Sequence, residues 1–126
     1  MLEVSLLALN DIKISKNFNL KEFDCKCGCN TVKVDSELVG RLQELREKIG
    51  KPIIITSGYR CPTHNKRVDG SQTSQHMRGK AVDIKVSGMT AKELAKLGEQ
   101  LGFDGIGTYS NFVHLDVRGI RARWNG

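Results

Sequence analysis

The chain has 126 residues, of which 39% are hydrophobic and 27% charged, and its formal net charge is +6. This length predicts one domain over residues 1–126, and no apolar run reaches the roughly 20 residues of a transmembrane helix. The net positive charge fits simple solubility or attraction to a polyanion. Because the basic residues are scattered and do not alternate with aromatic ones, we expect no nucleic-acid partner.

The N-terminal region carries few structural signals. Residues 1–9 are mildly apolar, but no basic residue precedes this run and it ends at Asn10 and Asp11, so we predict no signal peptide. Further along, Leu20 and Phe23 indicate a short turn or helix that enters the fold. Either Asn17 or Asn19 is the expected cap of this element.

Three of the four cysteines lie within five residues, at Cys25, Cys27 and Cys29, and the fourth is Cys61. Four cysteines can hold a structural zinc ion, although such sites usually use two closely spaced pairs. A disulfide between Cys61 and one of the other three is equally compatible with the sequence in an oxidising environment. A loop of reduced thiols is the third possibility, and the spacing leaves all three open.

The middle of the chain predicts a helix, a strand and a loop. Leucines at helical spacing predict a helix over residues 35–49, which Gly50 and Pro52 end. The β-branched run at 53–56 predicts a buried strand. Residues 63–75 are polar and rich in turn formers, which predicts a long surface loop, and such loops are often functional.

The C-terminal half predicts three strands, one helix and a last segment that is either a strand or a tail. Alternation at 80–86 predicts a strand with Asp83 on its polar face. Thr90 and Glu93 form a capping-box pattern at the start of a helix that Gly102 ends. Strands are expected around 106–109 and 112–117, and residues 120–124 form either a last strand or a tail that packs Trp124 on the core.

Two short clusters carry side chains suited to metal chemistry. The first contains His76 and Asp83, and the second, about thirty residues later, contains His114 and Asp116. Because side chains alternate along a strand, His114 and Asp116 share one face. If the strands at 80–86 and 112–117 are neighbours, Asp83 and His114 converge and His76 reaches them from its loop. Two histidines and one aspartate form a three-ligand set that holds a catalytic zinc with one open position.

These residues resemble the zinc D-alanyl-D-alanine carboxypeptidases and related murein peptidases (M15-type). This group includes vancomycin-resistance dipeptidases and phage endolysins, and it shares its scaffold with the Hedgehog signalling domain. The resemblance covers about residues 17–124 and is carried by the pattern Ser74-x-His76-x-x-Gly79-x-Ala81-x-Asp83, the downstream His114, and residues 57–62 followed by Asn65. It implies an α+β fold: a small, mainly antiparallel sheet with helices on one face and a zinc groove on the other.

The resemblance also implies roles for individual residues. His76, Asp83 and His114 would bind one Zn²⁺, and Arg60 would stabilise the oxyanion that forms on attack. Ser74 and Tyr109 would lie next to the metal or the substrate. Zinc would lower the pKa of its bound water towards about 7.

The sequence departs from the family pattern at the general base. Many members place Asp or Glu three residues before the last zinc histidine, where this chain has Asn111. The nearest carboxylate is Asp116, which we expect to act as the general base or to orient His114. Asp104 is a weaker candidate for the base.

The resulting expectation is a monomeric zinc metallopeptidase that hydrolyses peptidoglycan stem peptides, as a carboxypeptidase or an endopeptidase. An endolysin-like enzyme without a signal peptide would be made in the cytoplasm and reach the cell wall by lysis or non-standard export. The alternative is a non-catalytic zinc-containing module that binds the wall or a protein on the same scaffold. A third hypothesis, a cysteine-based zinc module that binds nucleic acid, leaves the His76–Asp83 pattern without a role.

Overall fold

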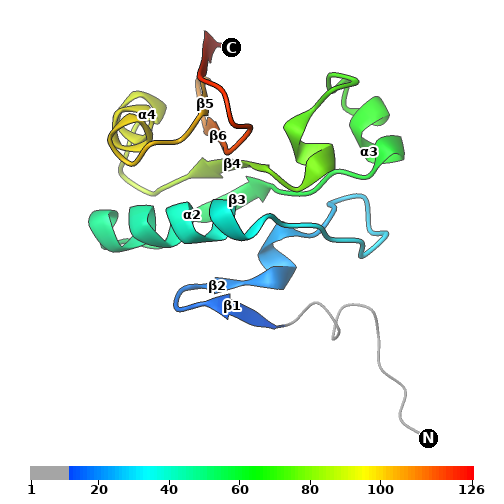
Figure 1. Ribbon diagram of the computed structural model, residues 1–126, viewed down its shortest axis with the longest axis horizontal. Helices are drawn as coiled ribbons and strands as arrows, with labels where there is room; N and C mark the ends of the chain where they lie inside the picture. Colours follow the sequence, from blue (N-terminus) through cyan, green and yellow to red (C-terminus); the bar gives the residue numbers. More distant parts are fainter. Residues whose placement is uncertain (1–11) are drawn as a thin grey trace, which may run out of the picture.

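A five-stranded sheet with the order β3-β4-β6-β5-β7 forms the centre of the fold in the computed structural model, which describes residues 12–126 (Figure 1). Its strands are β3 (Ile54–Ser57), β4 (Ala81–Lys85), β5 (Gly105–Thr108), β6 (Val113–Asp116) and β7 (Ala122–Asn125). All neighbouring pairs are antiparallel except β5 and β7, which are parallel. This confirms the predicted α+β fold with a mainly antiparallel sheet.

The two main helices form where the sequence predicted them. Helix α2 (Ser36–Ile49) begins after Asp35, whose side chain accepts from the backbone N–H of Glu37, and it ends at Gly50 in the left-handed conformation. Helix α4 (Ala91–Gln100) begins with the predicted capping box. Both helices contribute apolar side chains to one core cluster with the inward faces of the central strands, among them Leu38, Leu42, Leu45, Val82, Ile84, Leu94, Val113 and Leu115.

The first described residues form a small hairpin and a turn of helix. Strands β1 (Lys13–Ser15) and β2 (Phe18–Asn19) pair antiparallel, and the 3₁₀ helix η1 (Leu20–Phe23) follows. Asn19 is the cap, because its side chain accepts from the N–H of Lys21. The predicted helical turn is therefore confirmed. The prediction about residues 1–9 lies outside the described part of the chain.

Three predictions about local structure were wrong in part. The strand predicted as buried at 53–56 is β3, which lies at the edge of the described sheet beside β4 and leaves Ile54 47% exposed. The predicted loop at 63–75 contains helix α3 (Pro62–Arg67) and ends in the 3₁₀ helix η2 (Gln75–Arg78). Pro62 occupies the first turn of α3, where its missing N–H costs nothing. Residues 122–125 form strand β7, which confirms the strand alternative for the last segment but shifts its predicted bounds. Trp124 contacts His114.

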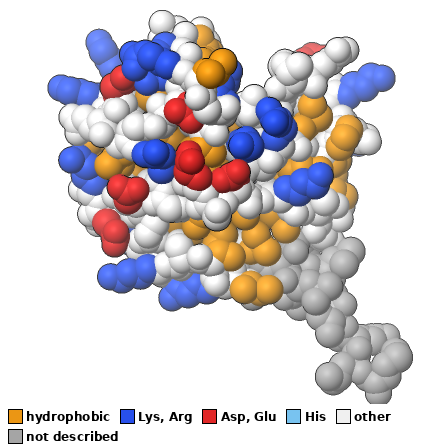
Figure 2. Space-filling model, viewed as in Figure 1, with side chains coloured by type: hydrophobic (Ala, Val, Ile, Leu, Met, Phe, Trp, Pro, Cys, Tyr) orange, Lys and Arg blue, Asp and Glu red, His pale blue; other side chains and the backbone are white. Residues whose placement is uncertain are grey.

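Charges of both signs are mixed on the face of the molecule seen in Figure 2. Figure 2 shows Lys and Arg side chains interspersed with Asp and Glu over the face seen there. Among the described residues, no helix is long and apolar enough to cross a membrane.

The core makes a direct prediction about stability. Leu42 lies in α2 and is fully buried, whereas Glu44 in the same helix is exposed. Leu42→Ala should lower the free energy of unfolding by about 2–5 kcal/mol, since it leaves a cavity in the core. The matched control Glu44→Ala should change it by less than about 0.5 kcal/mol. Urea denaturation followed by circular dichroism measures both, and equal effects would contradict the described packing.

Candidate metal centre

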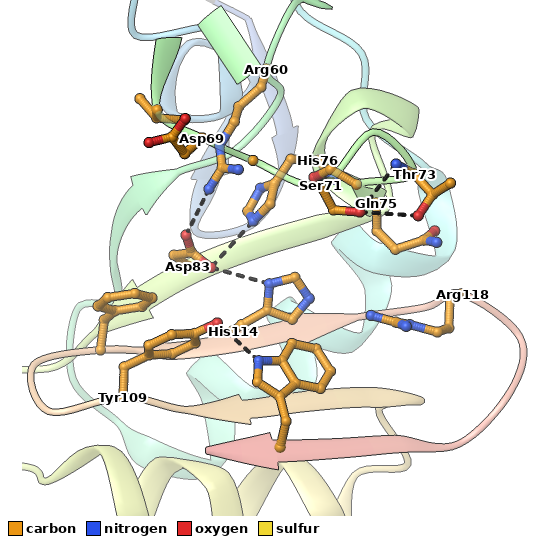
Figure 3. Close-up of a pocket in the computed structure, with 15 residues that line it drawn as sticks. Arg60, Asp69, Ser71, Thr73, Gln75, His76, Asp83, Tyr109, His114 and Arg118 are labelled. Atoms are coloured by element: carbon orange, nitrogen blue, oxygen red, sulfur yellow. Dashed lines mark hydrogen bonds and ion pairs between the residues drawn. The ribbon is translucent and has the colours of Figure 1, made fainter. Parts of the chain in front are cut away.

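His76, Asp83 and His114 meet on the face of the sheet opposite the main helices. Asp83 in β4 and His114 in β6 are direct partners in the antiparallel register. His76 reaches them from η2, which precedes β4. One ligand atom from each of the three residues lies within 4.8 Å of the other two, and all three side chains point toward one another in Figure 3.

The distances inside this cluster suit a tetrahedral metal site. Asp83 Oδ1 is 3.3 Å from His76 Nε2 and 3.2 Å from His114 Nδ1. Ligand atoms about 2.0–2.1 Å from a tetrahedral zinc lie about 3.3–3.4 Å from one another. The three side chains are at most 9% exposed. The ligand set is therefore assembled at close to the spacing that zinc requires.

The second nitrogen of each histidine is anchored. His76 Nδ1 is 2.8 Å from the carbonyl oxygen of Gly58, and His114 Nε2 is 2.7 Å from Asp116 Oδ2. Because both partners are acceptors, each of these nitrogens carries the hydrogen in the neutral ring. The lone pairs of His76 Nε2 and His114 Nδ1 then face Asp83, as in metal sites whose histidines are held from behind by a carbonyl or a carboxylate.

This arrangement leaves one buried polar atom without a partner. His76 Nε2 is buried and has no hydrogen-bond partner. In the assigned tautomer it is an acceptor that faces another acceptor, the carboxylate of Asp83. Two such groups repel each other unless a proton or a metal ion lies between them. The residues present therefore fit a zinc ion.

The electrostatics keep the cluster ready for a cation. Burial raises the pKa of Asp83, but the N–H groups and positive charge that His114 and His76 offer when protonated outweigh it and hold this pKa well below its usual range. Burial lowers the pKa of His114, while Asp116 and Asp83 raise it, and the net direction is upward. Asp83 is thus ionised at neutral pH, and protons compete with a metal for His114.

Asp116 is fully buried behind His114 rather than open to the groove. It accepts from His114 Nε2 and from Arg118, whose Nη2 lies 2.7 Å from Asp116 Oδ2. Burial raises the pKa of Asp116, but these two partners outweigh it and hold this pKa well below its usual range. A side chain at Gly105 would collide with the carboxylate, so glycine makes room for it. Arg118 was not identified from the sequence; its only signal is its position two residues after Asp116.

Arg60 lies at the edge of the cluster. Its Nη2 is 3.4 Å from Asp83 Oδ2, and its other nitrogens reach Ser57 Oγ and Asn65 Oδ1, each at 3.3 Å. Asn65 belongs to α3 and is buried. The guanidinium is therefore held from three sides beside the metal ligands, as Figure 3 shows for its approach to Asp83.

A groove of about 510 Å³ opens over the three ligands. Tyr109 stacks on Phe112, and its hydroxyl accepts from the indole N–H of Trp124. The other lining residues include Arg60, Arg118, Ser74 and Gln75, together with Asp69, which the sequence did not single out.

Two further residues named in the sequence analysis are Ser74, expected beside the metal or substrate, and Asp104, a weaker candidate for the general base. Ser74 lines the groove and caps η2, with its hydroxyl accepting from the N–H of His76. Asp104 lies outside the groove and accepts from the N–H of Gly119. Asn111 does not line the groove either.

The four cysteines also come together. Cys25, Cys27, Cys29 and Cys61 place their sulfur atoms within 4.8 Å of one another, separately from the His–Asp–His cluster. All four are free thiols in this structure. The chain therefore contains two groups of side chains that can hold a metal.

Comparison with known proteins agrees with this geometry. The family model of Peptidase M15 matches residues 16–116. The chain is 29% identical over 104 residues to the protein named "Probable peptidoglycan L,D-endopeptidase MepK" of Haemophilus influenzae. The alignment covers 75% of this chain and 55% of that protein, so the chain spans about half the length of this relative.

The site predicts how metal binding responds to substitution. Asp83→Asn should lower zinc affinity about 100-fold or more, since it removes the charged ligand that lies between the two histidines. Asp104→Asn is the matched control, because the new amide can still accept from Gly119 and the residue lies outside the groove. Competitive titration with a fluorescent zinc chelator measures both. Equal affinities would show that Asp83 is not a ligand.

Proposed function

Because the chain belongs to the peptidase M15 family, we propose that it is a zinc-dependent peptidase that hydrolyses peptide bonds in peptidoglycan stem peptides. The observation that carries the proposal is the His76–Asp83–His114 cluster, in which both histidines are anchored from behind and aim a lone pair at one carboxylate oxygen. The peptidoglycan substrate is supported by the printed name of the Haemophilus relative. That name also favours an endopeptidase acting on an L,D bond over a carboxypeptidase.

The chain's own residues have distinct tasks in this reaction. His76, Asp83 and His114 would hold the zinc ion, which when bound supplies a Lewis acid and makes water a nucleophile near neutral pH. Arg60 projects a fixed positive charge beside the ligands, where it can bind the substrate carbonyl oxygen as negative charge develops on it. Such a donor typically contributes 10²- to 10³-fold to the rate.

The groove suits an anionic peptide. Arg60 and Arg118 both line it, and the guanidinium carbon of Arg118 lies 5.2 Å from the centre of the Trp124 ring. Aromatic surface from Tyr109, Phe112 and Trp124 provides apolar contacts beside these charges. A stem peptide carries carboxylates and small apolar side chains, which such a lining complements.

We propose that Asp116 positions His114 instead of acting as the general base. Its carboxylate is fully buried and is occupied by His114 and by Arg118. A general base must reach the proton that it removes, and Asp116 does not line the groove. A carboxylate behind a ligating histidine fixes the ring orientation and increases its basicity.

The proposed activity is tested on purified muropeptides by liquid chromatography and mass spectrometry. Wild-type protein with zinc should produce new fragments whose masses identify the bond. Arg60→Gln should lower kcat about 10²–10³-fold with unchanged zinc content, because it removes the charge that faces the substrate and keeps all three proposed metal ligands. Arg78→Gln, an exposed residue outside the groove, is the matched control and should keep full activity.

Each outcome of this assay is informative. Loss of a terminal D-amino acid alone identifies a carboxypeptidase, whereas two peptide fragments identify an endopeptidase. If zinc-loaded wild-type protein binds muropeptides without cleaving them, the peptidase hypothesis is wrong and the chain is a binding module.

Asp116→Asn separates the two roles considered for Asp116. If Asp116 positions His114, the substitution should lower zinc affinity about 10–100-fold, and excess zinc should restore most of the activity. If Asp116 were the general base, zinc affinity would stay near the wild-type value and kcat would remain low at saturating zinc. Zinc titrations combined with kcat measurements over a range of zinc concentrations distinguish these results.

A further inference from the structure

We propose that Cys25, Cys27, Cys29 and Cys61 bind a second zinc ion, a structural one, which ties the loop of residues 24–31 to the segment that carries Arg60. This site is separate from the His76–Asp83–His114 cluster, and its existence does not depend on peptidase activity.

The positions of the sulfur atoms fit a tetrahedral tetrathiolate site. Cys27 Sγ lies 3.4 Å from Cys25 Sγ and 3.7 Å from Cys61 Sγ. All four sulfur atoms lie within 4.8 Å of one another. With zinc–sulfur bonds of about 2.3 Å, the sulfur atoms of a tetrahedral site lie about 3.8 Å apart. The cluster is thus close to the required size, and small side-chain adjustments complete it.

The backbone of the loop is shaped to present alternate cysteines to one side. Gly28 has φ +92°, which favours glycine, and Asn30 has φ +61°. The N–H of Cys25 donates to the carbonyl of Thr31 at 2.9 Å, which closes the loop. These two residues and this hydrogen bond fold the loop around a common point, where three sulfur atoms meet Cys61.

Backbone N–H groups support the sulfur atoms. The N–H of Cys61 points at Cys25 Sγ, and the N–H of His64 points at Cys61 Sγ, both at 3.4 Å. Hydrogen bonds to the charged form of a group favour that form. Donors around ligating atoms are also a regular feature of metal sites. These amides thus favour the thiolates that zinc binds.

The two alternatives explain fewer of these observations. One disulfide would use two sulfur atoms and leave the convergence of the other two without a cause. Reduced thiols act as small hydrophobic groups and are normally buried, whereas Cys29 is exposed and Cys27 and Cys61 are partly so. Four soft sulfur ligands select zinc or iron over hard cations. We assign zinc because a tetrahedral set of four cysteines is a usual structural zinc site.

The site has a structural consequence for the groove. Cys61 follows Arg60 directly and caps α3, whose Asn65 contacts the Arg60 guanidinium. Three residues before Cys61, Gly58 supplies the carbonyl that anchors His76. A metal ion on Cys61 would therefore restrain residues 58–65 and would connect them to the loop of residues 24–31. Structural zinc contributes directly to folding stability.

The first test counts metals by elemental analysis, in protein purified without chelator and without reductant. Wild type should contain about two zinc ions per chain, and Cys29→Ala and Asp83→Asn about one each. The double variant should contain almost none. Lys26→Ala, an exposed residue of the same loop, is the matched control and should keep both ions. Because Cys29 is exposed, its substitution removes little packing.

The second test identifies the thiol state of the wild-type protein, so it needs no variant. A mercurial reagent that titrates thiols should release about one zinc ion, detected with a colorimetric dye, as the four cysteines react. A third test compares variants: limited proteolysis should cut within residues 24–31 faster in Cys29→Ala than in Lys26→Ala.

The outcomes separate this proposal from the proposed function. Fewer than four reactive thiols in denatured protein with chelator would indicate a disulfide and overturn the site. Four thiols without a second metal, or iron in place of zinc, would overturn the assignment as well. If Asp83→Asn loses no metal while Cys29→Ala loses one, the tetrathiolate site stands and the catalytic site fails.

Discussion

The antiparallel register between β4 and β6 is the constraint on which the rest of the candidate site depends. It places Asp83 opposite His114, and on the reverse face it places Val82 and Leu115 in the core. Because side chains alternate, a slip by one residue would exchange these faces. The polar side chains would then enter the core and the leucine would enter the groove. The hydrophobic effect thus selects the register that brings Asp83 and His114 together in the candidate metal site.

Buried charge is the second constraint, and a continuous chain of contacts meets it. Asp83 and Asp116 are both buried carboxylates, which is costly unless each is paired. His114 lies between them and contacts both, and Arg118 completes the series at the far end. Removing one member of such a series leaves its neighbour buried and unpaired. The resulting loss of folding free energy is larger than the contribution of the lost contact itself. The orientation of His114 is therefore a property of the whole series.

The sequence was most informative where periodicity and local capping decide the structure. Alternation along residues 112–117 correctly predicted that His114 and Asp116 share a face, and leucine spacing predicted α2 almost to the residue. Helix α3 was missed because six residues are too few for a periodic signal, and its cap is a cysteine. Arg118 was missed because its side chain turns back onto Asp116, and such a contact produces no recognisable pattern in the sequence. Which nitrogen of each histidine faces Asp83 depends on distant partners such as the carbonyl of Gly58.

The segment of residues 58–65 connects all of these features. Its backbone holds His76 through Gly58, its side chains include Arg60, and Cys61 joins it to the N-terminal loop. The segment itself is short and belongs to no strand, so the sheet does not determine its conformation. It is instead held by backbone contact with Phe23, whose carbonyl accepts from the N–H of Tyr59 at 2.8 Å. A side chain at Gly58 would collide with the backbone of Phe23, so glycine permits this close approach. The position of the Arg60 side chain thus depends on the backbone contact with Phe23. The proposed zinc ion on the four cysteines would strengthen this contact, which the sheet does not support.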